Sequence, residues 1–150
     1  MTSNSSRGLA RLRRAVFARH ANPWSAWSRW ASTPLLLVPM WTRRWSHAAI
    51  VGAWMALNPV VFPEPADEHA WATRAMLGEE QWIVDRPRDA ALGVNIAATV
   101  AGLLALVAAR RRRPVTAGTA TAAQLASLLV YWELMNRYLE HHRRNSSRTG

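Results

Sequence analysis

The chain has 150 residues, no cysteine and a formal net charge of +10 at pH 7. The lack of cysteine excludes a disulfide scaffold, a metal or iron–sulfur site held by thiolates, and a thiol nucleophile. The positive charge comes from 19 arginines and no lysine, and it allows a nucleic acid, an anionic lipid surface or no specific partner. The acidic residues are clustered, because residues 63–89 hold seven of the nine and form an acidic loop in a basic chain.

The amino-terminal part of the chain is predicted to contain a disordered tail and a short amphipathic helix. Residues 1–8 are small and polar, which is typical of a disordered terminus. Residues 9–19 place Leu9, Leu12 and Val16 on one face and most arginines elsewhere. Such a helix suits an anionic lipid surface, and the alternative interpretation is a solvated basic arm.

A row of tryptophans precedes the first apolar segment, residues 26–42. Trp24, Trp27 and Trp30 are three residues apart and therefore lie along one side of a helix, which Asn22 is expected to cap with Pro23 in its first turn. This row is compatible with a soluble core or with a belt of tryptophans at the membrane interface. The apolar residues that follow favour the belt. The segment itself is short, so it spans a bilayer only if Arg29 reaches the interface; otherwise it is re-entrant or interfacial.

Three uncharged apolar runs of 17 to 20 residues follow, and they determine the predicted fold. Residues 90–109 carry no charge, end at four arginines and match the hydrocarbon thickness at about 30 Å of helix. A soluble bundle needs polar outer faces, which these segments lack. We therefore predict an all-α fold, a membrane helical bundle of three or four transmembrane helices with a short amphipathic N-terminal helix. It is a single helical membrane domain over residues 9–142 with a polar tail at 143–150, and its apolar segments are 26–42, 46–62, 90–109 and 115–139.

Two topologies are compatible with the distribution of arginines. If residues 26–42 do not cross, the amino end, Arg43–Arg44 and Arg110–Arg113 share the cytoplasmic side. If all four segments cross, the acidic loop and the tail share the side of the amino end. Four consecutive arginines in one short turn oppose translocation, so we expect three full crossings and a short first helix.

Four sequence motifs indicate a family. In chain order they are HANPWSAWSRW (20–30), LNPVVFPEP (57–65), DEHAWATRAMLGE (67–79) and YWELMNRYLEHH (131–142). In this order among apolar segments they resemble a family of small, uncharacterised, multi-pass integral membrane proteins, a domain of unknown function. The resemblance covers most of residues 17–143. It implies a helical membrane protein and transfers no catalytic residue.

A polar stripe on the last predicted helix is the first candidate site. Its members are spaced by three, four, seven and eight residues, so they share one face; they are Glu133, Asn136, Arg137, Glu140 and His141. Glu133 and Arg137 have the favourable order for an i,i+4 ion pair, which we expect to face other helices. The stripe is either a solvated helix end or a polar groove that handles protons or binds an anion.

The acidic loop contains the second candidate site, formed by Asp67, Glu68 and His69. These residue types are ligands for hard or borderline cations. Because the three are consecutive, their side chains diverge, and we expect Asp67 and Glu68 to lie in the first turn of a short helix instead. No metal site, no cofactor and no catalytic residue is predicted.

The sequence therefore predicts a small multi-pass protein of the cell membrane whose biochemical activity is unknown. A non-enzymatic component that packs helices or contacts lipid or protein is favoured. The alternative is a membrane-embedded enzyme or proton-coupled site that uses Glu133, Arg137, His141 and the acidic loop. The expected partners are a bilayer with anionic headgroups and either a second copy or another membrane protein. Nucleic acid is not expected, because no aromatic residues or binding fold surround Arg110–Arg113.

Overall fold

The computed structural model describes residues 19–147, so the predicted tail 1–8 and almost all of the predicted helix 9–19 lie outside the described residues. The described chain is helical and contains no strand, which confirms the predicted all-α class. Its elements are α2 (Pro23–Ser32), η1 (Thr33–Leu36), α3 (Leu37–Thr42), α4 (Trp45–Val61), α5 (Trp71–Asp85), α6 (Ala90–Arg110) and α7 (Pro114–Ser146).

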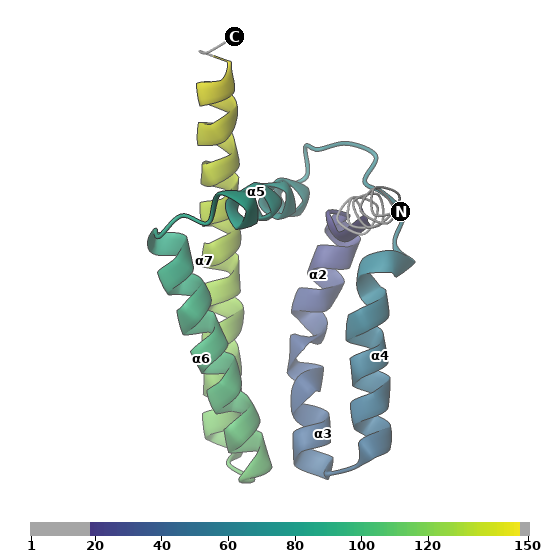
Figure 1. Cartoon of the computed structure of the whole chain (residues 1–150). Coiled ribbons are helices and arrows are strands. Elements are labelled where there is room, and N and C mark those ends of the chain that lie inside the picture. Colours follow the sequence, from purple (N-terminus) through teal and green to yellow (C-terminus); the bar gives the residue numbers. More distant parts are fainter. Residues whose placement is uncertain (1–18, 148–150) are drawn as a thin grey trace, which may run out of the picture.

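The long elements form two antiparallel hairpins that stand side by side, and α5 lies across one end of them (Figure 1). The first hairpin consists of α2–η1–α3 and α4, and the second consists of α6 and α7. The last turns of α7 continue past α5 and carry the carboxyl end away from the bundle (Figure 1). This helix extends to Ser146, into the region predicted as a polar tail.

The first segment reaches from one end of the bundle to the other. At its start Asn22 Nδ2 donates to the carbonyl oxygen of Pro63 at 2.9 Å, just beyond the end of α4. At its other end Arg43 donates to the carbonyl oxygen of Arg110 at 3.4 Å, in the turn between α6 and α7. The segment therefore joins the two ends of the described bundle, although its helices α2 and α3 have 10 and 6 residues.

A 3₁₀ turn explains why Pro34 does not stop this segment. Pro34 has no N–H to donate, and at this point η1 takes the place of α-helical bonding. The N–H of Thr33 donates to the carbonyl oxygen of Trp30, the acceptor that Pro34 leaves open, and the hydroxyl of Thr33 donates to the carbonyl oxygen of Arg29 at 3.0 Å. At the start of α2, Asn22 Oδ1 accepts from the N–H of Trp24 at 2.9 Å, the cap that the sequence predicts.

Small residues let α6 approach its neighbours closely. Ala98, Gly102, Ala105 and Ala109 are buried along one face of α6. A Cβ built on Gly102 would lie 2.6 Å from Nε2 of Gln124 on α7, so a larger residue is excluded unless that side chain moves. The opposite face of α6 is exposed and apolar, and its largest side chains are Ile96, Val100, Leu103, Leu104 and Val107.

The main core lies where α5 crosses the bundle. Met135 and Ala75 are fully buried there, and Met76 and Tyr131 are 4 % and 2 % exposed. Gly78 permits the crossing, because a Cβ at this position would lie 2.8 Å from the carbonyl carbon of Met135. The crossing holds α5 roughly perpendicular to the hairpins (Figure 1).

Candidate functional site

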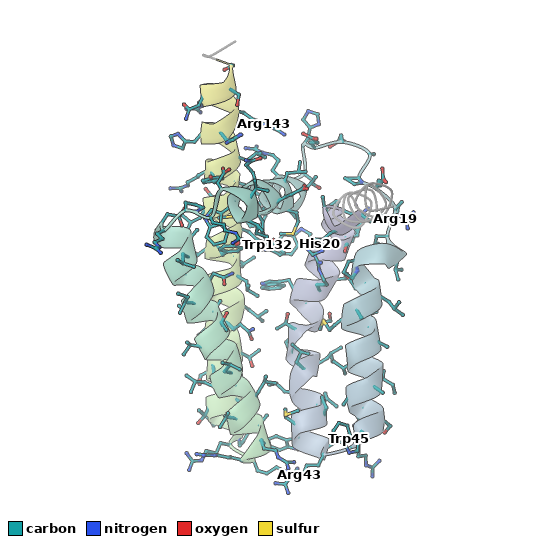
Figure 2. The ribbon with its side chains drawn as sticks, viewed as in Figure 1. Arg19, His20, Arg43, Trp45, Trp132 and Arg143 are labelled. Carbon is teal, nitrogen blue, oxygen red and sulfur yellow. The ribbon has the colours of Figure 1, made fainter. Side chains whose placement is uncertain are left out.

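Two ionisable pairs from distant parts of the chain meet beneath α5. Arg29 of α2 hydrogen-bonds through Nη1 to the ring of His20, and its Nη2 lies 3.8 Å from the sulfur of Met76 on α5. Tyr131 of α7 donates its hydroxyl proton to Oε1 of Glu79 at 3.2 Å. Figure 2 shows His20, a member of this group, and Trp132, both close to α5. We call His20, Arg29, Glu79 and Tyr131 the junction cluster, because it joins α2, α5 and α7.

The junction cluster borders a pocket of about 180 Å³. His20, Arg29 and Glu79 supply its polar groups, and the rest of the lining is apolar apart from Thr33: Ala26, Trp30, Met76, Leu128 and Trp132. This volume holds several water molecules or one small polar ligand. The pocket is thus a mainly apolar space with a few convergent polar groups, the usual character of a ligand site.

Burial shifts the pKa values of His20 and Glu79, two of the titratable groups at this pocket. Burial, with a smaller contribution from the neighbouring Arg29 charge, lowers the pKa of His20 from 6.5 to about 4. The His20 ring is therefore neutral at pH 7 and accepts a hydrogen bond from the guanidinium. Burial also raises the pKa of Glu79, against the opposing effects of the Tyr131 hydrogen bond and the Arg29 charge. The cluster can thus exchange a proton at Glu79 beside a fixed positive charge.

Four tryptophans pack together next to the pocket and join the same three helices. Trp27 of α2 stacks on Trp71 of α5 with ring centroids 5.9 Å apart, and it meets Trp132 of α7 edge-on at 5.4 Å. Trp30 contacts Trp27 at 5.8 Å and donates its Nε1 proton to the carbonyl oxygen of Leu125 at 3.1 Å. Of the tryptophan row seen in the sequence, Trp24 is 73 % exposed, and Trp27 remains 40 % exposed although it contacts three other rings.

The predicted polar stripe lies against α5 and outside the pocket. Arg137 Nε donates to Oε1 of Glu133 at 2.9 Å, the i,i+4 pair that the spacing predicts. The side chains of Arg137 and Glu133 are 68 % and 44 % exposed, so the pair faces α5 on one side only. The reason is that α7 continues past α5, which covers one of its sides. Glu133 faces α5 through a 3.2 Å hydrogen bond from Nε1 of Trp71.

The remaining members of the stripe differ in their surroundings. Asn136 is buried, and its Nδ2 donates to the carbonyl oxygens of Trp132 at 3.0 Å and Trp71 at 3.3 Å. Glu140 forms an ion pair with Arg74 of α5. His141 is exposed and has no hydrogen bond or ion pair within the described residues. The stripe therefore attaches α5 to α7 and does not enclose a groove.

The acidic-loop residues are exposed and do not converge on a cation site. Asp67 Oδ1 accepts from the backbone N–H of His69 at 2.8 Å, and this bond lowers the pKa of Asp67. Glu68 pairs with Arg143 of α7 at 2.5 Å. Within residues 19–147 there is no group of three or more His, Asp or Glu residues arranged to hold a metal ion.

The expected first turn of a helix at Asp67 and Glu68 is wrong. The helix α5 begins at Trp71, and Ala70 is its N-cap. The turn closed by the side chain of Asp67 competes with helical bonding and keeps these residues outside the helix. The Glu68–Arg143 pair therefore attaches the loop to α7 at an exposed position beyond the polar stripe.

The junction cluster was not predicted from the sequence. One signal was present, since Arg29 is a charged residue inside an apolar segment, and such residues have functional roles by default. Glu79 and Tyr131 are 50 and 102 positions away from Arg29, so no periodicity connects the three. Only the packing of α5 onto the bundle brings them together.

A family model matches residues 8–117. The chain belongs to DUF6653, a family of unknown function. The matched region of this DUF6653 protein contains α2 to α6 and thus His20, Arg29 and Glu79, whereas Tyr131 and the polar stripe lie beyond it. The motif-based resemblance to a family of unknown function is confirmed to this extent. No curated protein and no solved structure matches the chain.

Proposed function

We propose that this DUF6653 protein is an integral membrane protein in which α2–η1–α3, α4, α6 and residues 114–130 of α7 cross the bilayer. The observation that carries the proposal is the surface of α6. Among the described helices, α6 alone is long and apolar enough to cross a membrane, with a mean hydropathy of 2.1, yet only 17 % of that apolar stretch is buried. In water, a helix of this hydropathy would be expected to bury most of its surface.

The lengths and ends of the hairpins support the same proposal. The 21 residues of α6 rise about 32 Å, close to the thickness of a hydrocarbon core. The outer face of α4 is also apolar, with Ile50, Leu57 and Val61 exposed by 68 %, 56 % and 61 %. Arginines occupy both turns at the end opposite α5, where charged side chains would meet headgroups. At the other end α5 lies across the bundle, as expected of a helix at the membrane surface (Figure 1).

Within this membrane, we propose a non-enzymatic component that contacts lipid or another membrane protein. The proposed location is the cell membrane, with multiple crossings, and anionic lipid headgroups are the proposed partner of the arginine turns. A proton-coupled role is the second candidate, and the half-buried junction cluster favours it. That cluster, and not the exposed Glu133, Arg137 and His141, is where we place such a role.

Extraction tests the membrane proposal directly. After lysis and washing of membranes with alkaline carbonate and then with high salt, we expect the chain to remain in the pellet and to need detergent for release. Burial of several apolar segments in lipid resists both washes, whereas a peripheral protein held by arginines is released by salt. Recovery of the protein in either wash would refute the proposal.

Cysteine labelling tests the four crossings. The chain has no cysteine of its own, so only the introduced residue can react. We expect a cysteine at Arg19 and one at Ala66 to react from the same side of the membrane, and a cysteine at Val115 to react only from the other side. In intact cells a membrane-impermeant thiol reagent should not label Val115→Cys, because four adjacent arginines oppose translocation. Labelling of Arg19→Cys and Ala66→Cys from opposite sides would restore the three-crossing topology.

A further inference from the structure

A hollow of about 390 Å³ lies at the arginine end of the bundle, between the α3–α4 turn and the end of α6. Three arginines line it: Arg43 and Arg44 from the turn, and Arg110 from the last position of α6. Its other walls are apolar and include Met40 and Trp45. Figure 2 shows Arg43 and Trp45 together at this end of the molecule. A cationic rim beside an apolar wall is complementary to an anionic amphiphile.

The arginines at this end have no acidic counterpart. Within residues 19–147 every aspartate and glutamate lies at or near the α5 end, and each ion pair joins residues of that end. The six arginines of the two turns form no ion pair in this part of the chain; they are Arg43, Arg44, Arg110, Arg111, Arg112 and Arg113. This end therefore presents concentrated positive charge that an external anion can neutralise.

The turn between α3 and α4, which forms part of the rim, has an arginine at a position that suits glycine better. Arg43 ends α3 in the left-handed region with φ of 57°, where a side chain other than that of glycine or asparagine is disfavoured. Its guanidinium reaches back to the carbonyl oxygen of Arg110 at 3.4 Å and ties the rim together. Arg112 lies apart, with its guanidinium 5.0 Å from the centre of the Trp41 ring. The turn arginines are thus not equivalent, and three of them form a defined hollow.

We propose that this hollow binds the phosphate headgroup of an anionic phospholipid. Arg44 and Arg110 supply guanidinium groups to the phosphate, and Met40 and the exposed Trp45 lie against the glycerol and the first acyl carbons. The inference rests on the proposed membrane location and deepens it by naming the lipid class and the site. A phospholipid is favoured over free phosphate because four of the seven lining residues are apolar: Pro39, Met40, Trp45 and Ala48.

The experiment is thermal unfolding of the detergent-solubilised protein while phosphatidylglycerol is added in a phosphatidylcholine carrier. We expect phosphatidylglycerol to raise the melting temperature in a saturable manner, whereas phosphatidylcholine alone and inorganic phosphate do not. The double variant R44Q/R110Q should weaken the apparent affinity by about tenfold or more. The matched control is R111Q/R113Q, which removes the same charge from the same end but leaves the hollow intact, and we expect its affinity to fall less than about threefold.

A second variant tests the hollow without any change of charge. Ala48 lines it, and Ala48→Phe should fill the space and abolish the response to phosphatidylglycerol. Equal weakening by the two double variants, together with an unchanged response of Ala48→Phe, would overturn the site and leave only surface charge. A response to inorganic phosphate equal to that of the lipid would also overturn it. In either case the protein would stay in the carbonate pellet, so failure of the lipid site is distinguishable from failure of the membrane proposal.

Discussion

Replacing Gly78 with alanine is expected to lower the stability of the protein by about 3 kcal/mol or more. The new Cβ would lie 2.8 Å from the carbonyl carbon of Met135, so the backbone of α5 or α7 has to move. A shift of α5 would also separate Trp71 from Trp27 and loosen the burial of Met76. Thermal unfolding in detergent measures the loss, and near-ultraviolet circular dichroism reports the tryptophan cluster.

Gly93→Ala is the control for this change. A Cβ on Gly93 of α6 meets nothing within 4 Å, so the variant should be neutral or more stable by up to about 1 kcal/mol, the usual gain for alanine in a helix. If Gly78→Ala melts at the same temperature as Gly93→Ala, then α5 does not pack against α7 as described.

Acidification is expected to destabilise the protein through His20. The pKa of His20 is about 4 in the folded chain and 6.5 in an unperturbed one. As the pH falls from 6.5 toward 4, the unfolded chain binds a proton that the folded chain does not, so folding loses up to about 3 kcal/mol of stability. Glu79 acts in the opposite direction, because its raised pKa lets the folded chain take up a proton first. Arg29 and Tyr131, the other polar groups of the cluster, stay in one protonation state over this range.

Variants isolate the contribution of His20 from that of Glu79. His20→Gln keeps a neutral acceptor for Arg29 but cannot titrate, so it should flatten the loss of stability between pH 6.5 and 4. His69→Gln is the matched control, because the His69 side chain is 95 % exposed, and its pH profile should follow that of the unmodified protein. Identical slopes for His20→Gln and the unmodified protein would show that His20 is not buried in a neutral state.

The sequence by itself determined the helical class, because long uncharged segments without period-two alternation favour helices, and the described residues contain no strand. It also determined local features that depend on neighbours along one helix, such as the Asn22 cap and the Glu133–Arg137 pair. It did not determine that residues 23–42 reach across the whole bundle, because the apolar part of this segment is short and only the structure shows that a 3₁₀ turn joins α2 to α3.

Only the tertiary structure decided where the polar residues lie and which of them form a site. Periodicity placed Glu133, Arg137 and Glu140 on one face of α7, but how exposed that face is depends on where α5 crosses and how far α7 continues beyond it. Arg29 and Glu79 border one pocket although 50 residues separate them, because Gly78 allows α5 to lie directly on Met135. The two arginine turns likewise form one rim because two antiparallel hairpins bring their turns to the same end. Such contacts arise from the packing of whole helices, and no spacing along a single helix encodes them.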